Sequence, residues 1–582
     1  MLESAYEILS LTLRYWFIAL LLAALFLLLR LFLRELRIFR AIDREIEQSG
    51  QGFALRLLSD PGRLLPQGSL FPLKGEMLLG SGRGADLRIE SESLFAQHVL
   101  LRTEGEGLAL EPVGNALVAV SGEELGKRGL ARMGDELQIG ELLFRLEEGR
   151  PLLDEQPTRR AAREPSFQLP GLDWILLFLC VFEFSGFALL TFYKGFSPLS
   201  AALAAAMPLL LVLQSRLSRR FLPHMDQSLL LIGHFLCALG LILLVRLSPE
   251  RAQKQALFYL GGAALSFVAT VLVAKLKSLA FLRWPAILLS LGLLGATLVL
   301  GTEKFGAKNW LGVEGFSFQP SEFVKIALIL VLSLALSQRR SLPSLLPAGL
   351  FAGSCLLLIV LQKDLGAVLI CFCICLFLYY AATGNLGVSL GALLLAGLGA
   401  LLLYFLFDHV QVRVAMWRNP WRSAEGKGYQ IVQALVAIAS GGMTGSGLGL
   451  GSPRVIPLYD TDFIFAAICE EFGMGIALMA LFLYILLFLR ASFIASRCQS
   501  GFDALVCMGA LASLSSQTFL IIGGVIKMIP LTGVTLPFVS YGGSSILSCM
   551  ILLGVLQGVS VRAGRREEEA YLRAQAPREM EI

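Results

Sequence analysis

The sequence predicts an all-α polytopic membrane protein that carries one small all-β domain, and three observations indicate this fold class. Of its 582 residues 56% are hydrophobic and only 16% are charged, with a mean hydropathy of +0.71. A soluble chain carries about a quarter charged residues, so lipid must cover much of this apolar surface. The apolar residues form runs long enough to cross a bilayer, and one polar stretch between the first two runs alternates with a period of two.

The apolar runs give about thirteen candidate transmembrane helices, because a membrane-crossing helix needs roughly 17–22 apolar residues. The first run, within residues 1–40, lacks a strongly basic start and a small-residue cleavage site, so it is interpreted as a retained helix rather than a signal peptide. The candidate spans are residues 15–33, 174–193, 199–213, 228–245, 256–274, 284–300, 322–336, 346–361, 365–381, 386–407, 464–489, 504–526 and 545–559.

The placement of lysine and arginine predicts the orientation of these helices. With the N-terminus outside and an odd number of spans, the basic clusters fall inside, and the loop 246–254 is the main exception. The tail 563–582 is then cytoplasmic, and the loops 301–321, 408–463 and 527–544 lie outside. The clusters predicted to lie inside are residues 30–40, 159–163, 216–220, 275–277, 339–340, 490–497 and 562–566.

The polar stretch at residues 53–147 predicts a cytosolic β-sandwich, because short alternating runs are separated there by Gly, Asp and Asn. A charged linker at 148–172 and two further helices within 173–227 follow it. The net charge of +5 is small, and no nucleic-acid partner is expected. The ten Cys lie in or beside apolar runs and the four His are scattered, so neither a disulfide framework nor a metal centre or other cofactor is expected.

Polar residues stand where the outer loops meet helices. Glu322 and Lys325 lie three residues apart on one helical face behind Pro320, where they can form an ion pair, although an ordinary capped helix start shows the same spacing. Asp364 stands at another outer junction. The Pro- and Gly-rich segment 527–545 is interpreted as the wall of a groove.

The outer loop 408–463 is too long for a simple connection, and loops of this length are usually functional or disordered. Asp462 stands where the loop re-enters the membrane, at a partly dry boundary that raises the pKa of a carboxylate from about 4 towards the range of a general base. Capping of the next helix is the alternative interpretation. The glycines at 441–451 match no nucleotide-binding fingerprint and are interpreted as a flexible turn.

Two adjacent acids, Glu470 and Glu471, lie about two turns deeper along the same predicted helix. Acids at this depth are costly unless they are paired or face a cavity. They are interpreted as structural, with Arg413 or Lys325 as the candidate partners.

Five motifs occur along the chain in the order GAKNWL…FQPSE, QKDLG, GYQIVQALVAIASGG, TDFIFAAICEEFG and PLTGVTLPFVSYGGSS. In this order they resemble the SEDS family, the RodA, FtsW and sporulation relatives that polymerise the bacterial cell-wall precursor lipid II. With their helices they span residues 228–562, and ten candidate spans fall in this interval, as in the ten-helix core of the family.

The resemblance implies that Asp462 is the catalytic acid and that Trp310, Glu322, Lys325 and Asp364 serve activity or the geometry of the groove. It also implies a bacterial plasma-membrane protein and a class B penicillin-binding transpeptidase as partner.

Two positions depart from the family pattern. Asn309 stands where the family usually has Arg, and Lys363 stands where it has Pro. The polyprenyl diphosphate leaving group needs cations, and the outer candidates are Lys308, Lys325, Lys363 and Arg413.

The β domain resembles a forkhead-associated (FHA) module, a class that binds phosphothreonine, through LLGSG, Gln97-His98 and MGDELQIGELLFRL. Ser81 and Phe95 replace the usual Arg and Ser, which leaves Arg83 and His98 as candidates for phosphopeptide contacts. A phosphothreonine protein is one implied partner, and plain protein docking is the alternative.

The resulting hypothesis is glycosyl transfer at the outer leaflet, metal-independent or assisted by a divalent metal. Asp462 would take the proton of an acceptor hydroxyl that attacks a lipid-linked donor sugar. Two alternatives remain: a lipid II flippase whose polar path is lined by Glu183, Glu470 and Glu471, and a scaffold that recruits partners through the β domain.

Overall fold

The computed structural model describes residues 2–48, 53–59, 69–73, 76–82, 85–89, 93–104, 107–148, 171–276, 278–304, 306–313, 316–338 and 342–575. The chain divides into two compact units, Leu33–Pro165 on the one hand and Met1–Phe32 with Ser166–Ile582 on the other. Most of the predicted linker at 148–172 lies outside the described residues, and the described chain resumes shortly before the next helix.

The larger unit is built from long apolar helices, and each expected span overlaps one of them, which confirms the polytopic fold. Among the described residues, eleven helices are long and apolar enough to cross a membrane, while α8 and the apolar part of α9 are shorter. The helices are α1 (Leu2–Gln48), α3 (Leu172–Thr191), α4 (Pro198–Phe221), α5 (Gln227–Leu247), α6 (Pro249–Lys275), α7 (Arg283–Leu300), α8 (Pro320–Leu336), α9 (Leu342–Leu361), α10 (Leu365–Thr383), α11 (Leu386–Leu406), α12 (Asp408–Arg418), α13 (Tyr429–Gly441), α14 (Ile464–Ser496), α15 (Gly501–Val525) and α16 (Gly543–Gln575).

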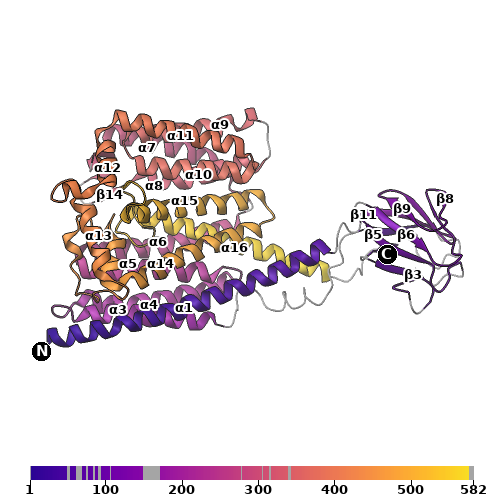
Figure 1. Ribbon diagram of the computed structural model, residues 1–582, viewed down its shortest axis with the longest axis horizontal. Helices are drawn as coiled ribbons and strands as arrows, with labels where there is room; N and C mark the ends of the chain where they lie inside the picture. Colours follow the sequence, from indigo (N-terminus) through magenta and orange to yellow (C-terminus); the bar gives the residue numbers. More distant parts are fainter. Residues whose placement is uncertain are drawn as a thin grey trace. The chain divides into compact units, whose positions relative to one another are not determined.

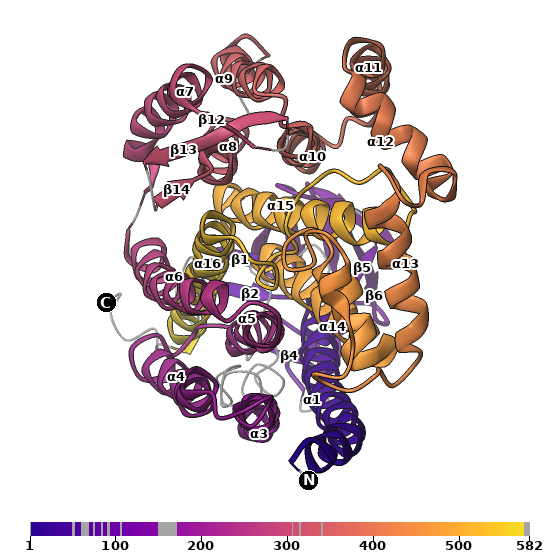
Figure 2. The same ribbon diagram turned by 90° about the vertical axis from the view of Figure 1, so that its left-hand side faces the viewer.

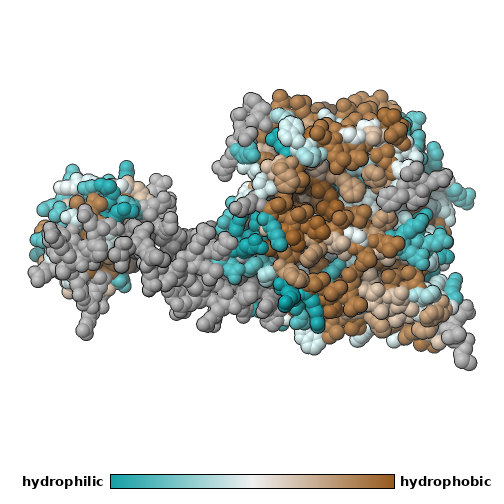
Figure 3. Space-filling model, turned by 180° about the vertical axis from the view of Figure 1, so that it is seen from behind, coloured by the Kyte–Doolittle hydropathy of each residue, from teal (hydrophilic) through white to brown (hydrophobic). Residues whose placement is uncertain are grey.

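The helices run side by side, with α5 near the centre of the bundle (Figures 1 and 2). Most of α5 is buried, because α3, α6 and α14 pack around it. The helices α1, α3 and α4 lie along one edge of the bundle, and α7, α9 and α11 lie along the opposite edge. Hydrophobic side chains cover the visible face of the bundle, and hydrophilic ones gather towards the helix ends (Figure 3). This is the surface that a bilayer requires.

The two ends of the bundle differ in what they carry. One end holds α12, α13 and a small antiparallel sheet of β12 (Thr302–Lys304), β13 (Ala307–Val313) and β14 (Phe316–Phe318). The opposite end holds ion pairs between residues that were predicted to lie on the cytoplasmic side. One of them joins Arg490 to Asp226, the N-cap of α5. The acid and the arginine are both buried, so the pair fixes α5 to α14.

The first helix is longer than predicted. It continues well past residue 33, where the apolar run ends, to Gln48. The last helix, α16, likewise continues into the predicted tail at 563–582 and ends at Gln575. Polar helix-forming residues extend both helices beyond the part that lipid could cover.

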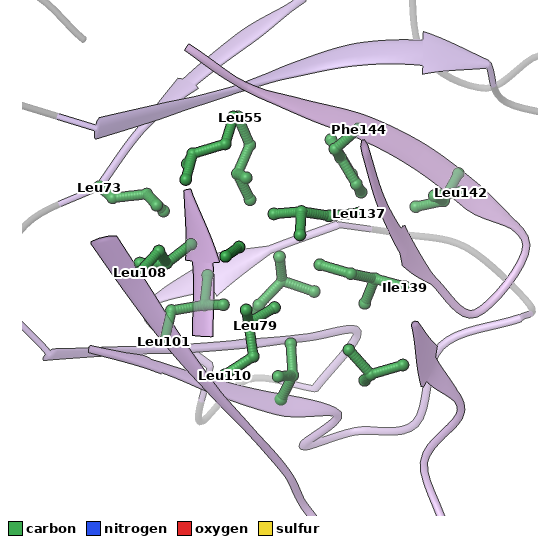
Figure 4. Packing of buried hydrophobic residues seen from close by; sticks show 14 of the residues in the cluster. Leu55, Leu73, Leu79, Leu101, Leu108, Leu110, Leu137, Ile139, Leu142 and Phe144 are labelled. Atoms are coloured by element: carbon green, nitrogen blue, oxygen red, sulfur yellow. The ribbon is translucent and has the colours of Figure 1, made fainter. Parts of the chain in front are cut away.

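The smaller unit contains the predicted β-sandwich, with one six-stranded and one five-stranded sheet. Leucines, Phe144 and Ile139 from both sheets fill the space between them (Figure 4). The short strands β2, β8 and β9 were not predicted. The strands are β1 (Phe53–Ser59), β2 (Leu70–Pro72), β3 (Glu76–Gly80), β4 (Leu87–Arg88), β5 (Val99–Glu104), β6 (Gly107–Pro112), β7 (Val118–Val120), β8 (Glu123–Glu124), β9 (Gly129–Arg132), β10 (Glu136–Ile139) and β11 (Leu142–Glu148).

Candidate active site

Asp462 lies in a tight turn directly before α14. The amides of Thr461 and Phe463 both donate to the carbonyl of Leu458, at 3.2 Å each. The segment 530–545 holds this turn from the other side, because Ser540 Oγ donates to the Thr461 carbonyl at 2.6 Å. The N-cap of α14 is Phe463, without a side-chain cap, so the structure contradicts the interpretation of Asp462 as a helix cap.

Arg413, on α12, faces the same point as Asp462. A Cβ atom added to Gly533 would lie 3.6 Å from Oδ2 of Asp462 and 3.7 Å from Nη2 of Arg413. The guanidinium also donates through Nη1 to the carbonyl of Thr532 at 3.2 Å. Gly533 has a φ of 72°, a conformation that favours glycine. The acid and the arginine therefore flank a position kept open by the lack of a side chain.

Burial is the main influence on the pKa of Asp462. Removal from water raises the pKa of Asp462 to about 6, while the Thr461 hydrogen bond and the charge of Arg413 oppose the rise. Burial also lowers the pKa of Arg413. A carboxylate with this pKa is ionised at pH 7 and is a stronger base than an ordinary aspartate. Asp462 therefore has the protonation behaviour that a general base needs.

Glu322 and Lys325 form the ion pair that their spacing predicted, with 3.0 Å between Nζ and Oε2. Lys325 also donates to Gln517 at 2.8 Å, and Ser548 donates to Glu322 at 2.6 Å. All four side chains are buried. Gln517 in turn donates to the carbonyl of Thr535 at 2.9 Å. The pair thus joins α8, α15 and α16 beneath the segment that carries Gly533, and its contact with substrate stays a prediction.

Asp364 has a structural environment at the start of α10. Its Oδ1 accepts the amide of Ala367 at 3.1 Å, and its Oδ2 accepts Asn309 Nδ2 at 2.8 Å and Gln319 Nε2 at 2.7 Å. Asn309, one of the two departures from the family pattern, therefore supplies a neutral donor to this carboxylate.

Lys308 is bound to the end of α7. Its ammonium donates to the carbonyls of Leu298 and Val299 at 2.8 and 3.0 Å, which are last-turn acceptors of that helix. Trp310 lies half-buried in β13, where it pairs with Thr302. Contacts of Lys308 and Trp310 with the donor diphosphate or sugar stay predictions.

His409 is a residue near the site that the sequence did not single out. Burial, Arg413 and Lys363 lower its pKa, so cationic side chains from α12 and from the α9–α10 turn lie near one another. Lys363 is exposed and has a φ of 60°, which is uncommon outside glycine. The four-residue spacing of His409 and Arg413, which places both on one face of a helix, could have identified His409 from the sequence.

Glu470 and Glu471 are structural, but neither predicted partner is correct. Glu471 pairs with Arg246 at 3.3 Å and accepts the amide of Gly449 at 3.0 Å. Glu470 accepts the amide of Ser452 at 2.7 Å. Sequence reasoning missed Arg246 because it was counted as a loop charge.

The predicted loop 246–254 is almost entirely helical, because α5 ends at Leu247 and α6 begins at Pro249. Arg246 is buried against Glu471, and Arg251 pairs with the buried Asp460. Two of the three basic side chains at 246–254 therefore pair with acids.

The glycine-rich segment 441–451 forms turns, as predicted, and its backbone is bonded to α14, while its flexibility stays a prediction. The amides of Ser446 and Gly447 donate to the carbonyls of Glu470 and Glu471, at 2.8 and 3.0 Å. Beyond Gly473, where α14 has non-helical angles of φ 87° and ψ 165°, the helix amides bond back to the loop. The loop and the helix thus complete each other's backbone hydrogen bonds.

Glu183, the remaining acid of the predicted polar path, is buried inside the bundle. Glu183 is fully buried in α3 and lies 3.2 Å from His234 of α5, whose other ring nitrogen contacts Tyr259. Glu183, Glu470 and Glu471 are therefore engaged with protein groups rather than lining an open polar path.

In the β domain, His98 is 1% exposed and uses both ring nitrogens on the backbone, accepting the amide of Phe95 at 3.1 Å and lying 3.1 Å from the carbonyl of Leu117. His98 thus holds two loops together, and phosphopeptide binding through it would require these bonds to break. Ser81, where the FHA pattern has Arg, donates to the carbonyl of Leu94. Arg83 lies outside the described residues.

Residues 226–564 match the family of FtsW, RodA and SpoVE, described as "Cell cycle protein". This is more than half of the chain, and it contains the whole site around Asp462. The protein therefore belongs to the FtsW/RodA/SpoVE family, a class of polytopic membrane proteins.

Similar proteins agree with this assignment. Peptidoglycan glycosyltransferase RodA of Mycobacterium tuberculosis is 36% identical over 388 residues, covering 60% of this chain and 80% of the relative. Stage V sporulation protein E of Bacillus subtilis is 32% identical, covering 58% and 96%. A solved structure described as "Structural coordination of polymerization and crosslinking by a peptidoglycan synthase complex" aligns with a TM-score of 0.50 and 28% identity, covering 59% of this chain and 98% of that chain.

Proposed function

We propose that this protein is a peptidoglycan glycosyltransferase that polymerises lipid II at the outer face of the bacterial plasma membrane. The observation that carries the proposal is the pair of Asp462 and Arg413, which face one another across Gly533 at the end of the bundle. Family membership and relatives named peptidoglycan glycosyltransferase support the same activity.

Asp462 acts as the general base. Its carboxylate takes the proton from the acceptor sugar hydroxyl as that oxygen attacks the anomeric carbon of the donor. The bond from the anomeric carbon to the diphosphate breaks, and polyprenyl diphosphate leaves with the electron pair. Arg413 stabilises the negative charge that develops on the diphosphate, because a buried cation acts strongly where water is excluded.

The donor and the acceptor keep their lipid tails in the bilayer while their sugars reach the outer end of the bundle. This requires the start of α14 to face outside, with the C-terminal helix end and the β domain in the cytoplasm. The basic clusters predict this orientation. A membrane-impermeant thiol reagent should label a Glu425→Cys variant in intact cells but not an Arg565→Cys variant, and the reverse pattern would refute the proposal.

A class B penicillin-binding transpeptidase is the proposed partner of the polymerase. The similar solved structure is described as a peptidoglycan synthase complex that coordinates polymerization and crosslinking, and this supports such a partner. The β domain is the proposed docking module for a cytoplasmic protein. Because His98 is committed to the backbone, an interaction with phosphothreonine would depend on Arg83.

The test is polymerisation of purified lipid II by the full-length protein. Asp462→Asn keeps the size of the side chain but removes the base, and activity should fall about 10²- to 10⁴-fold. Glu425→Gln is the matched control, because Glu425 is an exposed carboxylate of the same outer region and should not matter. Equal activity of Asp462→Asn and wild type would exclude this role.

A further inference from the structure

The helix α1 lies outside the residues that match the family, yet its first turns are bonded to the outer loop that leads to the active site. Tyr6 Oη and Ser10 Oγ both donate to the carbonyl of Leu448 at 2.9 Å, and Arg14 Nη1 donates to the carbonyl of Gly445 at 3.1 Å. The three donors are spaced by four residues, so they lie along one face of the helix.

The same face of α1 packs into the bundle below these bonds. Phe17 is 1% exposed, and its ring lies 4.9 Å from that of Phe182 on α3 and 5.8 Å from that of Phe472 on α14. Steps of three and four residues are typical of a helix that is seated along a fixed stripe. The buried residues of the stripe are Ser10, Phe17, Leu21, Ala24, Leu28 and Leu31.

The loop is shaped to receive this helix. Gly447 and Gly449 have φ values of 103° and 89°, which side-chain-bearing residues rarely adopt. A Cβ atom on Gly447 would lie 2.9 Å from Ser10 Oγ, and one on Gly449 would lie 2.5 Å from Tyr6 Oη. The two glycines therefore permit both the turn and the close approach of α1.

The loop also connects α1 to the segment that carries the catalytic acid. Ser446 and Gly447 bond to the backbone of Glu470 and Glu471 in the first turns of α14, and Asp462 immediately precedes these turns. A loop held on one side by α1 and on the other by α14 fixes where α14 begins. The position of Asp462 thus depends on bonds made by a helix outside the family core.

We infer that α1 is a built-in positioning element of the polymerase, and that Tyr6 and Ser10 are positioning residues that hold the 445–449 loop and thereby Asp462 in the reactive geometry. The inference rests on the proposed function. It assigns a catalytic consequence to an addition that the family match does not contain.

The experiment measures lipid II polymerisation by the full-length protein with the double substitution Tyr6→Phe and Ser10→Ala. Thr12→Val is the matched control, because the Thr12 hydroxyl is exposed and bonds only within α1, to the carbonyl of Ile8. We expect the double variant to lower kcat about tenfold with KM unchanged, since small misplacement of a catalytic group is costly. The pH at half-maximal kcat should move as well, because the burial of Asp462 changes.

Thermal unfolding of the double variant and the Thr12→Val control should occur at the same temperature. Wild-type kcat and pH profile in the double variant would overturn the inference. A loss of activity that merely follows a lower unfolding temperature would also overturn it, since that is a structural role. If wild type and Thr12→Val both fail to polymerise lipid II, the proposed function fails instead.

Discussion

Asp462 and Glu471 belong to one short stretch of chain at the start of α14, but the groups around the two carboxylates differ. Glu471 is fully buried, faces Arg246 and accepts a backbone amide. Asp462 faces Arg413 across Gly533, where no side chain fills the space next to its Oδ2. Both oxygens of Glu471 thus face protein groups, Oε2 the Gly449 amide and Oε1 the Arg246 guanidinium, and neither faces an open position. The difference indicates that an open position beside the carboxylate separates the proposed catalytic acid from the structural one.

Arg413 offers the largest effect after Asp462 itself. Arg413→Met should lower kcat about 10²- to 10³-fold, because the leaving diphosphate loses its buried cation. Arg413→Lys should recover part of this loss, since it keeps the charge but not the planar fork. The measurement is steady-state polymerisation of lipid II. A variant without charge that keeps full kcat would show that Arg413 serves only to hold the Thr532 carbonyl.

Glu471→Gln should act on stability rather than chemistry. Removing one partner leaves Arg246 buried and uncompensated, which costs about 3–5 kcal/mol. Denaturant titration of the purified protein measures the change in the free energy of unfolding. The kcat per folded molecule should remain near wild type. A large loss of kcat with unchanged stability would erase the distinction between the two acids.

The pH dependence of activity should follow Asp462. The base form is required and its pKa is about 6, so kcat should fall about tenfold per pH unit below this value and level off above it. Because this pKa lies above the value of about 4 for an unfolded aspartate, the unfolded chain ionises first, so Asp462 lowers the stability of the fold as the pH rises from about 4 to about 6 and causes no further change above that. The profile is measured with protein that is folded at every pH, and a midpoint near 4 would contradict the buried environment.

The smallest effect is expected from the β domain. Deleting residues 53–147 while keeping α1 should leave lipid II polymerisation by the purified protein unchanged, because every residue of the site around Asp462 lies in the helical unit. The same deletion should abolish capture of a cytoplasmic partner. A loss of polymerisation in the purified protein would show that the helical unit needs the β domain for activity.

Much of the helical fold could be predicted, because an apolar run of sufficient length has few alternatives to a membrane helix. The extension of α1 to Gln48 could not be predicted, since its polar residues do not indicate a membrane span. In the β domain, the alternating runs marked most strands. The very short strands such as β8 (Glu123–Glu124) were missed, because two residues show no period.

The site was predicted unevenly for a similar reason. Asp462 was identified by a local motif and its place at a membrane boundary. Gly533 and Arg246 were missed, because their roles arise from contacts between segments far apart in the chain. The positive φ angles of Gly447 and Gly449 likewise depend on which helix approaches them.

At Gly473 the backbone of α14 departs from helical geometry. Beyond it, the amides of Met474 and Gly475 bond to the carbonyls of Gly442 and Met443, at 2.8 and 3.0 Å, instead of continuing the ladder of α14. The loop 441–451 bridges this break, since the amides of Ser446 and Gly447 also bond to the carbonyls of Glu470 and Glu471 on the other side of Gly473. The two parts of α14 are therefore joined through a neighbouring segment of chain, and the geometry of the first part, which follows Asp462, depends on that segment as well as on the helix itself.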